Sequence, residues 1–111
     1  MKKFLVLYRA PITAFDQMMK ATPEQQKAGM DAWMAWGQKA ASSIVDMGAP
    51  LGKGLRVTPT GSSSARNDLG GYSIMQAESK EALADILKGH PHFMTPDGFI
   101  DVTEMLPLPG M

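Results

Sequence analysis

The sequence predicts an α+β fold of the ferredoxin-like βαββαβ type. Three observations support this fold class: an apolar segment at residues 3–9, a long amphipathic segment with helix-capping residues from Thr22, and a later series of strand, helix and strand patterns. Two right-handed βαβ crossovers in one four-stranded antiparallel sheet place two helices on one face. The opposite face then has no cover from its own chain.

Length, charge and cysteine content exclude several classes of protein. With 111 residues, the chain is expected to form a single domain over residues 1–111, because two cores would each bury too little surface. The 11 basic and 11 acidic residues leave no net attraction for nucleic acid or anionic lipid. The absence of cysteine and of any apolar stretch of ~20 residues points to a cytoplasmic protein without disulfides or membrane spans.

The N-terminal half begins with a predicted central strand and a long helix. Residues 3–9 are apolar without alternation, as in a strand that is buried on both faces. Residues 10–22 are predicted to form a loop with a short helical turn around Phe15–Lys20. The helix then begins with Thr22 as N-cap and Gln25 completing a capping box. Its apolar stripe continues to Val45, so we expect the helix to end at Gly48, in the left-handed conformation.

The middle of the chain is predicted to be a β-hairpin. Gly54–Thr58 and Gly71–Ala77 have strand patterns, and Pro59–Gly70 between them has the composition of a polar turn. Ser79 is the expected N-cap of a second helix over Lys80–Lys88. Alternating residues predict a closing strand over Phe99–Leu106.

The first strand indicates a second subunit. Phe4, Val6 and Tyr8 alternate with Leu5 and Leu7, so both faces of this strand are apolar. The helices can cover only one of them, and a second copy of the chain is the simplest cover for the other. We therefore expect a homodimer.

Four segments, taken in order and spacing, resemble the YCII-related family over nearly the whole chain, although no single motif is diagnostic. These segments are Lys3-Phe4-Leu5-Val6-Leu7-Tyr8, Trp33-x-x-Trp36, Gly70-Gly71-Tyr72-Ser73-Ile74 and Phe99-Ile100-Asp101-Val102. The resemblance implies a subunit that pairs sheet to sheet as a dimeric α+β barrel. It also implies a pocket between the sheet and the long helix.

The family's proposed acid–base pair does not transfer to this sequence. Some members carry a histidine on the first helix and an aspartate just before a proline that follows the second helix. Here Pro91 matches the proline, but His90 occupies the aspartate position and the histidine position falls near Gly37. The resemblance therefore implies the pocket but not its chemistry.

The segment His90-Pro91-His92, followed by Asp97, is the candidate catalytic site. In an extended peptide, side chains two residues apart project to the same side, so both imidazoles could meet one ligand. A carboxylate such as Asp97 can orient a histidine ring and raise its basicity for acid–base catalysis. Two alternatives stay open: the histidines cap a helix end by bonding a carbonyl, or the three residues bind a metal ion. Our hypothesis is the acid–base site, without a metal.

Tyr8, Arg9 and Trp33 are the candidate ligand-binding residues. Tyr8 and Arg9 end the first strand, and the guanidinium of Arg9 could hold a carboxylate, so a small, anionic organic ligand would fit. Arg9 could equally pair with a carboxylate such as Asp16 or Glu104. Trp33, with Trp36, could form an aromatic wall or belong to the core.

The predicted function is a small-molecule binder or a cofactor-independent enzyme that acts as a homodimer. No phosphate-binding loop or dinucleotide fingerprint occurs in the sequence, so no cofactor is expected. The alternative is a non-catalytic dimeric accessory protein, whose apolar surfaces serve only self-association or a protein partner.

Overall fold

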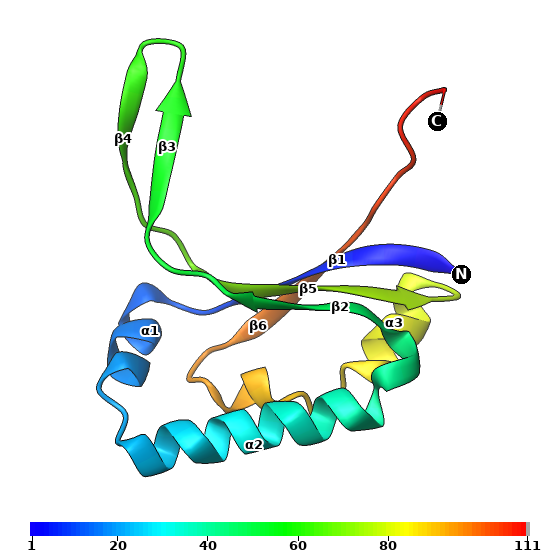
Figure 1. Cartoon of the computed structure of the whole chain (residues 1–111), viewed down its shortest axis with the longest axis horizontal. Coiled ribbons are helices and arrows are strands. Elements are labelled where there is room, and N and C mark those ends of the chain that lie inside the picture. The colour runs from blue at the N-terminus through cyan, green and yellow to red at the C-terminus, as the bar shows by residue number, and fades with distance from the viewer. Residues whose placement is uncertain (111) are drawn as a thin grey trace.

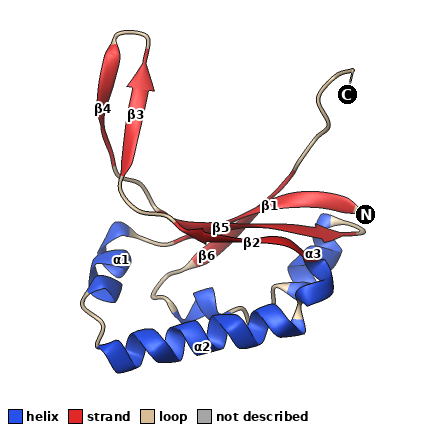
Figure 2. Ribbon diagram, in the orientation of Figure 1, coloured by secondary structure: helices blue, strands red, loops and turns tan. Residues whose placement is uncertain are grey.

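The computed structural model describes residues 1–110, which form two antiparallel sheets and three α-helices (Figures 1 and 2). The elements are β1 (Lys2–Arg9), α1 (Ile12–Met19), α2 (Pro23–Lys39), β2 (Ile44–Pro50), β3 (Gly54–Thr58), β4 (Gly61–Ala65), β5 (Leu69–Ala77), α3 (Lys80–Ile86) and β6 (Phe99–Glu104). Two short 3-10 helices are η1 (Ala41–Ser43) and η2 (Pro91–Met94). The larger sheet has the strand order β2-β5-β1-β6, and β3 pairs with β4 in a separate sheet.

The larger sheet confirms the predicted fold class. Without the β3–β4 hairpin, its strands and the helices α2 and α3 follow the order βαββαβ, with β1 and β5 at the centre. Figure 1 shows α1, α2 and α3 on one side of this sheet. This placement agrees with two right-handed crossovers in one sheet.

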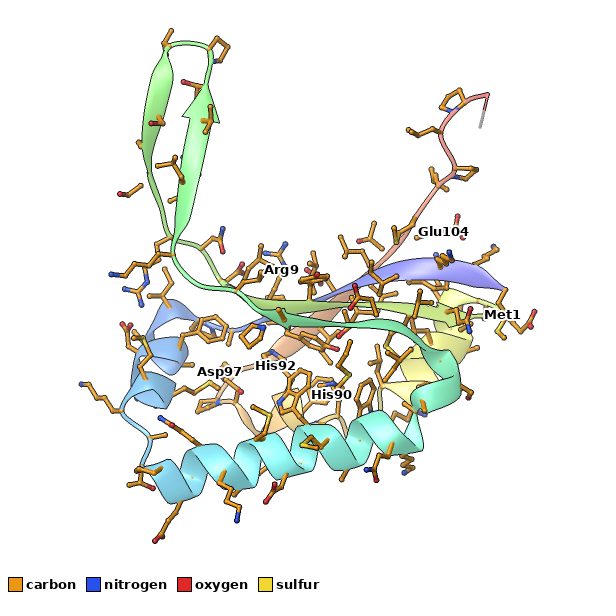
Figure 3. The ribbon with its side chains drawn as sticks, viewed as in Figure 1. Met1, Arg9, His90, His92, Asp97 and Glu104 are labelled. Carbon is orange, nitrogen blue, oxygen red and sulfur yellow. The ribbon has the colours of Figure 1, made fainter. Side chains whose placement is uncertain are left out.

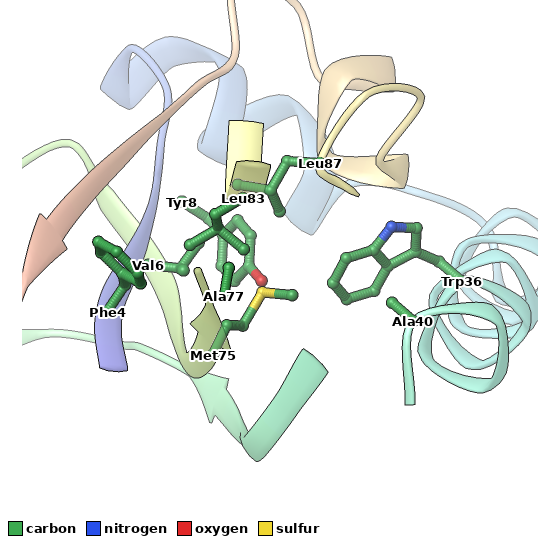
Figure 4. Close-up of a cluster of buried hydrophobic side chains, with 9 residues drawn as sticks. All are labelled: Phe4, Val6, Tyr8, Trp36, Ala40, Met75, Ala77, Leu83 and Leu87. Carbon is green, nitrogen blue, oxygen red and sulfur yellow. The ribbon is translucent and has the colours of Figure 1, made fainter. Parts of the chain in front are cut away.

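The core lies between the sheet and the helices. On β1, Phe4, Val6 and Tyr8 point into it and are at most 2% exposed. Met75 of β5 lies opposite Phe4 and is fully buried. The complete cluster in Figure 4 consists of Phe4, Val6, Tyr8, Trp36, Ala40, Met75, Ala77, Leu83 and Leu87.

The end of the long helix was predicted wrongly. We expected this helix to end at Gly48, but α2 ends at Lys39, and the edge strand β2 follows from Ile44 to Pro50. Ile44 and Val45 fit the spacing of a helical stripe, but they are β-branched and favour a strand. The second strand of the large sheet is therefore β2, and not the segment 54–58.

Gly48 has the expected positive φ, but in a bulge of β2 rather than at a helix end. Its φ is 76°, and the β2–β5 register shifts between Asp46 and Ala49. A Cβ atom at Gly48 would lie 1.8 Å from the carbonyl oxygen of Tyr72. This position therefore requires glycine for both its backbone conformation and its close approach to β5.

The predicted hairpin pairing was also wrong. β3 forms at the expected residues, Gly54–Thr58, but its partner is β4 (Gly61–Ala65), within the segment predicted to be a turn. β5 pairs instead with β1 and β2. The prediction missed β4 because its Gly-Ser-Ser-Ser-Ala sequence has none of the branched or aromatic residues that mark strands.

Both predicted helix starts are confirmed by their caps. The Thr22 hydroxyl accepts a hydrogen bond from the Gln25 N–H at 3.1 Å, and the Thr22 N–H donates to the Gln25 side chain at 2.9 Å. The Ser79 hydroxyl accepts from the Ala82 N–H at 3.0 Å. The segment 10–22, expected to be mostly loop, contains α1. No helix described within residues 1–110 has the length and apolarity to cross a membrane.

The sheet face away from the helices, called here the outer face, has an apolar centre. Leu5 lies opposite Ile74, and Leu7 lies opposite Tyr72. All four side chains are half-buried, and no element of residues 1–110 covers them (Figure 1). An apolar patch with a polar border is typical of an interaction surface.

Candidate functional site

Both histidines lie between the sheet and α2 (Figure 3). His90 is 1% exposed and His92 is 5% exposed. Both are buried although they lie in the irregular segment between α3 and β6. His90 is the N-cap of η2, and Pro91 takes the first position of that helix. The structure therefore places the two predicted catalytic residues in the interior.

Hydrogen bonding determines which nitrogen of His90 carries the proton. The Nδ1 atom of His90 accepts a hydrogen bond from the His92 N–H at 2.9 Å. A neutral imidazole has one N–H, so an accepting Nδ1 leaves the proton on Nε2. This Nε2–H is buried and makes no hydrogen bond within residues 1–110. An unpaired buried donor destabilises the folded state by about 1–3 kcal/mol, and most buried polar atoms in proteins have a hydrogen-bond partner. The Nε2–H of His90 is therefore an unusual group.

His90 is uncharged at neutral pH. Burial lowers the pKa of His90 to about 4, and the neighbouring His92 contributes in the same direction. The ring therefore offers a neutral hydrogen-bond donor rather than a positive charge.

His92 is held by the backbone of β1. Its Nε2 atom lies 2.7 Å from the carbonyl oxygen of Arg9. Because a carbonyl can only accept, Nε2 carries the proton and the Nδ1 atom of neutral His92 has a lone pair. Among residues 1–110, no hydrogen bond to this Nδ1 is found. A histidine that caps a helix end would also bond a backbone carbonyl, but here the carbonyl belongs to the distant strand β1 and not to a helix end.

Three aromatic side chains enclose the His90 ring. The Tyr8 ring stacks on it, with centroids 4.9 Å apart and planes 26° apart. Trp33 and Trp36 of α2 approach it edge-on, with centroid distances of 4.5 Å and 4.2 Å. Trp33 is half-buried, whereas Trp36 belongs to the core. Trp33 and Trp36 therefore pack against a histidine, and the alternative that they belong to the core holds for Trp36.

A hydrogen-bonded chain fixes Tyr8. The Tyr8 hydroxyl donates to Ser73 Oγ at 2.8 Å, and Ser73 donates to the carbonyl oxygen of Met47 at 2.7 Å. Burial raises the pKa of Tyr8, while the Ser73 hydrogen bond acts in the opposite direction. Sequence reasoning missed Ser73. The available signal was its spacing: Ser73, Met75 and Ala77 occupy every second position of β5 and so share the inward face.

Arg9 and Asp97 do not take the predicted positions in this site. The guanidinium of Arg9 pairs with Asp68 and, at 2.8 Å, with Asp101. Arg9 therefore pairs with carboxylates, as the alternative interpretation expected, but its partners are Asp68 and Asp101 rather than Asp16 or Glu104. Asp97 lies on an exposed turn with a φ of 55°, and within residues 1–110 it bonds neither histidine.

A shallow apolar groove lies between α2 and β2. Its volume is about 350 Å³, and its lining consists of Met34, Gly37, Gln38, Ala41, Ile44 and Met47. The groove includes Gly37, the residue near which the sequence resemblance places a histidine. Neither this groove nor a hollow of about 380 Å³ beside Lys2 has a histidine in its lining. No cluster of three potential metal ligands occurs among residues 1–110.

Comparison with known proteins identifies the fold only. No family profile matches the chain, and no curated protein matches its sequence. Among solved structures, the chain is similar to 5-chloro-2-hydroxyhydroquinone dehydrochlorinase (TftG) from Burkholderia phenoliruptrix AC1100, in complex with 2,5-dihydroxybenzoquinone. The TM-score is 0.50 at 17% sequence identity, and the match covers 89% of this chain and 90% of that chain. At this identity, the likeness shows a shared α+β fold.

Proposed function

We propose that this protein binds a small planar organic molecule between the sheet and α2, as a homodimer and without a cofactor. The observation that carries the proposal is the unpaired, buried Nε2–H of His90 among three aromatic rings. A buried donor with no partner is unfavourable unless something else satisfies it. A ligand oxygen is the acceptor that we assign to it.

The surroundings of His90 define the ligand class. Aromatic rings favour flat apolar molecules, and a single neutral donor favours a carbonyl or phenolic oxygen. Arg9 is already opposed by two carboxylates, so it supplies no free charge for an anion. We therefore propose an oxygenated aromatic or quinone-like ring, rather than the anionic ligand expected from the sequence.

Entry to the site requires movement of α2. Among its 17 residues, only Trp36 is buried, and Met30 and Met34 are 60% and 57% exposed. A helix with so little buried surface opens at low cost. The groove along α2 and β2 would be the entrance, with Met34 and Met47 as flexible lining.

Two nitrogens could support catalysis as well as binding. His90 would donate a hydrogen bond to the ligand oxygen from Nε2, which stabilises negative charge that develops there. The lone pair on Nδ1 of His92 could accept a proton, since the Arg9 carbonyl holds the proton of that ring on Nε2. Tyr8 and Trp33 would contact the ligand ring. Asp97 would reach the site only through a rearrangement of its turn.

Membership of the YCII-related family is part of this proposal. It is supported by the order of the four sequence segments and by the ferredoxin-like sheet. The similar solved structure contains 2,5-dihydroxybenzoquinone, a planar ring with oxygen substituents. That compound is therefore a reasonable first probe for this protein.

The homodimer is supported by the outer face. Leu5, Leu7, Tyr72 and Ile74 form an apolar centre that residues 1–110 leave uncovered. A second copy can cover it with the same surface, because a two-fold interface joins identical patches.

A non-catalytic accessory role is the second candidate. The observation in its favour is that His90 is 1% exposed and lines neither of the two hollows described above. In that case the aromatic cluster is simply core, and the outer face carries the function.

Two substitutions of His90 test the proposal. Asparagine keeps an acceptor near the Nδ1 position, whereas glutamine places an N–H near the Nε2 position. Binding of a panel of hydroxybenzenes and benzoquinones, including 2,5-dihydroxybenzoquinone, would be measured by calorimetry and by thermal shift. Ligands of the wild type should bind His90→Gln and lose affinity for His90→Asn. Equal binding by both variants, or no binding by the wild type, would favour the accessory role.

A further inference from the structure

The β3–β4 hairpin stands away from the rest of the protein (Figure 1). Its two strands pair only with each other, and nine of their ten residues are exposed. Leu55 and Val57, on one face of the hairpin, are 64% and 75% exposed. A lone two-stranded hairpin is marginally stable in water. This apolar face therefore needs a partner surface.

The C-terminal segment after β6 also leaves the body. The N–H of Met105 donates to the carbonyl oxygen of Lys3 at 2.9 Å. Beyond this bond, Leu106 and Leu108 are 74% and 64% exposed, and two prolines favour an extended backbone. Figure 1 shows the hairpin and this segment rising from opposite ends of the sheet, both on the side away from the helices. We call residues 54–65 the hairpin arm and residues 105–110 the C-terminal arm.

The exposed area is large enough for an extensive interface. The accessible surface is 7971 Å², compared with about 6000 Å² for a compact monomer of 12.0 kDa. The radius of gyration is 15.6 Å, compared with about 13 Å for a compact chain of this length. The excess surface, roughly 2000 Å², matches what one subunit buries in a large obligate interface.

The two regions carry formal charges of opposite sign, but half of these charges are already paired within the subunit. The stretch 47–67, which contains the hairpin arm, has three basic residues and no acidic one: Lys53, Arg56 and Arg66. The stretch 89–110, which leads into the C-terminal arm, has three acidic residues and no lysine or arginine: Asp97, Asp101 and Glu104. Arg66 pairs with Asp16, Asp101 with Arg9, and Glu104 with Lys2. Charge therefore argues against one alternative, because two hairpin arms, each with Arg56 and no acidic residue, would repel each other.

We infer that the hairpin arm of each subunit packs against the C-terminal arm of the other, so that the two copies clasp each other around their outer faces. This inference rests on the homodimer of the proposed function. A two-fold axis that runs between the outer faces, perpendicular to the strands, exchanges the two ends of the sheet. It brings one subunit's hairpin arm to the end where the other's C-terminal arm rises. Leu55 and Val57 then contact Leu106 and Leu108.

Cysteine cross-linking tests this contact directly, because the chain has no cysteine of its own. Val57→Cys and Leu106→Cys proteins would be mixed, allowed to exchange subunits and oxidised with diamide. The mixture should give a covalent dimer, and each protein alone should not. Ser63→Cys, on the opposite face of the hairpin beside Arg56, is the matched control and should lose most of the cross-link.

Light scattering on the same samples distinguishes the possible failures. A dimer without the mixed cross-link would overturn the clasp but leave the proposed homodimer intact. A monomer would overturn both. A cross-link in Val57→Cys alone would mean that the two hairpin arms pair with each other. A cross-link within a single Val57→Cys/Leu106→Cys chain would mean that the arms fold over their own sheet. Either result contradicts the inference.

Discussion

The imidazole of His90 stacks on the phenol ring of Tyr8, with centroids 4.9 Å apart and planes inclined by 26°. Both rings are held by further bonds: Tyr8 by Ser73, and His90 by the backbone N–H of His92. In this pair of rings, Nε2 of His90 is the polar atom for which residues 1–110 supply no hydrogen-bond partner. The proposed ligand site follows from that one atom.

The stability of the protein should fall with pH between about 6.5 and about 4. The unfolded chain protonates His90 near its ordinary pKa of 6.5, whereas burial lowers the folded pKa to about 4. Over this window the unfolded state binds the extra proton, so acid favours unfolding. The expected loss is about 2–3 kcal/mol. Urea unfolding at pH 7 and pH 4.5 measures it.

His90→Asn is the control for this pH dependence, since carboxylates also destabilise the fold in acid. In the variant, the part of the pH dependence that comes from carboxylates should remain, and the part that comes from His90 should be lost. The same pH slope in both proteins would show that His90 does not titrate as described.

Tyr8→Phe should destabilise the protein by about 1–3 kcal/mol. The change removes a buried hydroxyl that donates to Ser73 and leaves that acceptor without its partner. Tyr72→Phe is the matched control, because Tyr72 is half-buried on the outer face and no side-chain hydrogen bond of its hydroxyl occurs within residues 1–110. Chemical denaturation compares the two. Equal effects would mean that the Tyr8–Ser73 bond contributes nothing specific.

Gly48→Ala should destabilise the protein by at least about 2 kcal/mol. The residue has a φ of 76°, and a Cβ would lie 1.8 Å from the Tyr72 carbonyl oxygen, so β2 would have to move away from β5. At Gly52 a Cβ meets nothing within 4 Å, and Gly52→Ala should change stability by less than about 0.5 kcal/mol. If thermal unfolding showed similar effects for both, the bulge in β2 would be in doubt.

Leu7→Lys should weaken self-association by about 30-fold or more. A lysine at the centre of the outer face would bring a buried charge into the proposed interface, where Asp101, opposite Leu7 on β6, is already paired with Arg9. Thr103→Lys, at an exposed β6 position opposite Leu5, should have a much smaller effect. Sedimentation velocity over a range of concentrations gives the dissociation constants. A monomeric wild type, or no difference between the variants, would exclude this face as the interface.

Local signals in the sequence predicted the fold class, and long-range contacts account for the errors. Thr22 and Ser79 mark helix starts because each cap bonds a residue three positions later. The spacing of Ile44 fits the apolar stripe of α2 and so predicts a helix, and only its pairing with Met75 of β5 makes it part of a strand. The Ser-rich β4 carries no local strand signal at all.

The residues of the candidate site stand out in the sequence, but their arrangement does not. His90 and His92 stood out as the chain's two histidines, yet their burial depends on Tyr8 and Trp33, which are far away in the sequence. The group that holds His92 is the backbone carbonyl of Arg9, 83 residues away, and not the nearby Asp97. Every residue has a backbone carbonyl, so the sequence does not indicate which one a histidine will bond.

The most direct test of the central claim is nitrogen-15 NMR of the His90 ring in the wild-type protein at pH 7, before and after addition of a binding compound from the panel. The account predicts a neutral ring with its proton on Nε2, and a shift of that Nε2 signal when the ligand binds. A proton on Nδ1, a charged ring, or an Nε2 signal that a bound ligand leaves unchanged would contradict it.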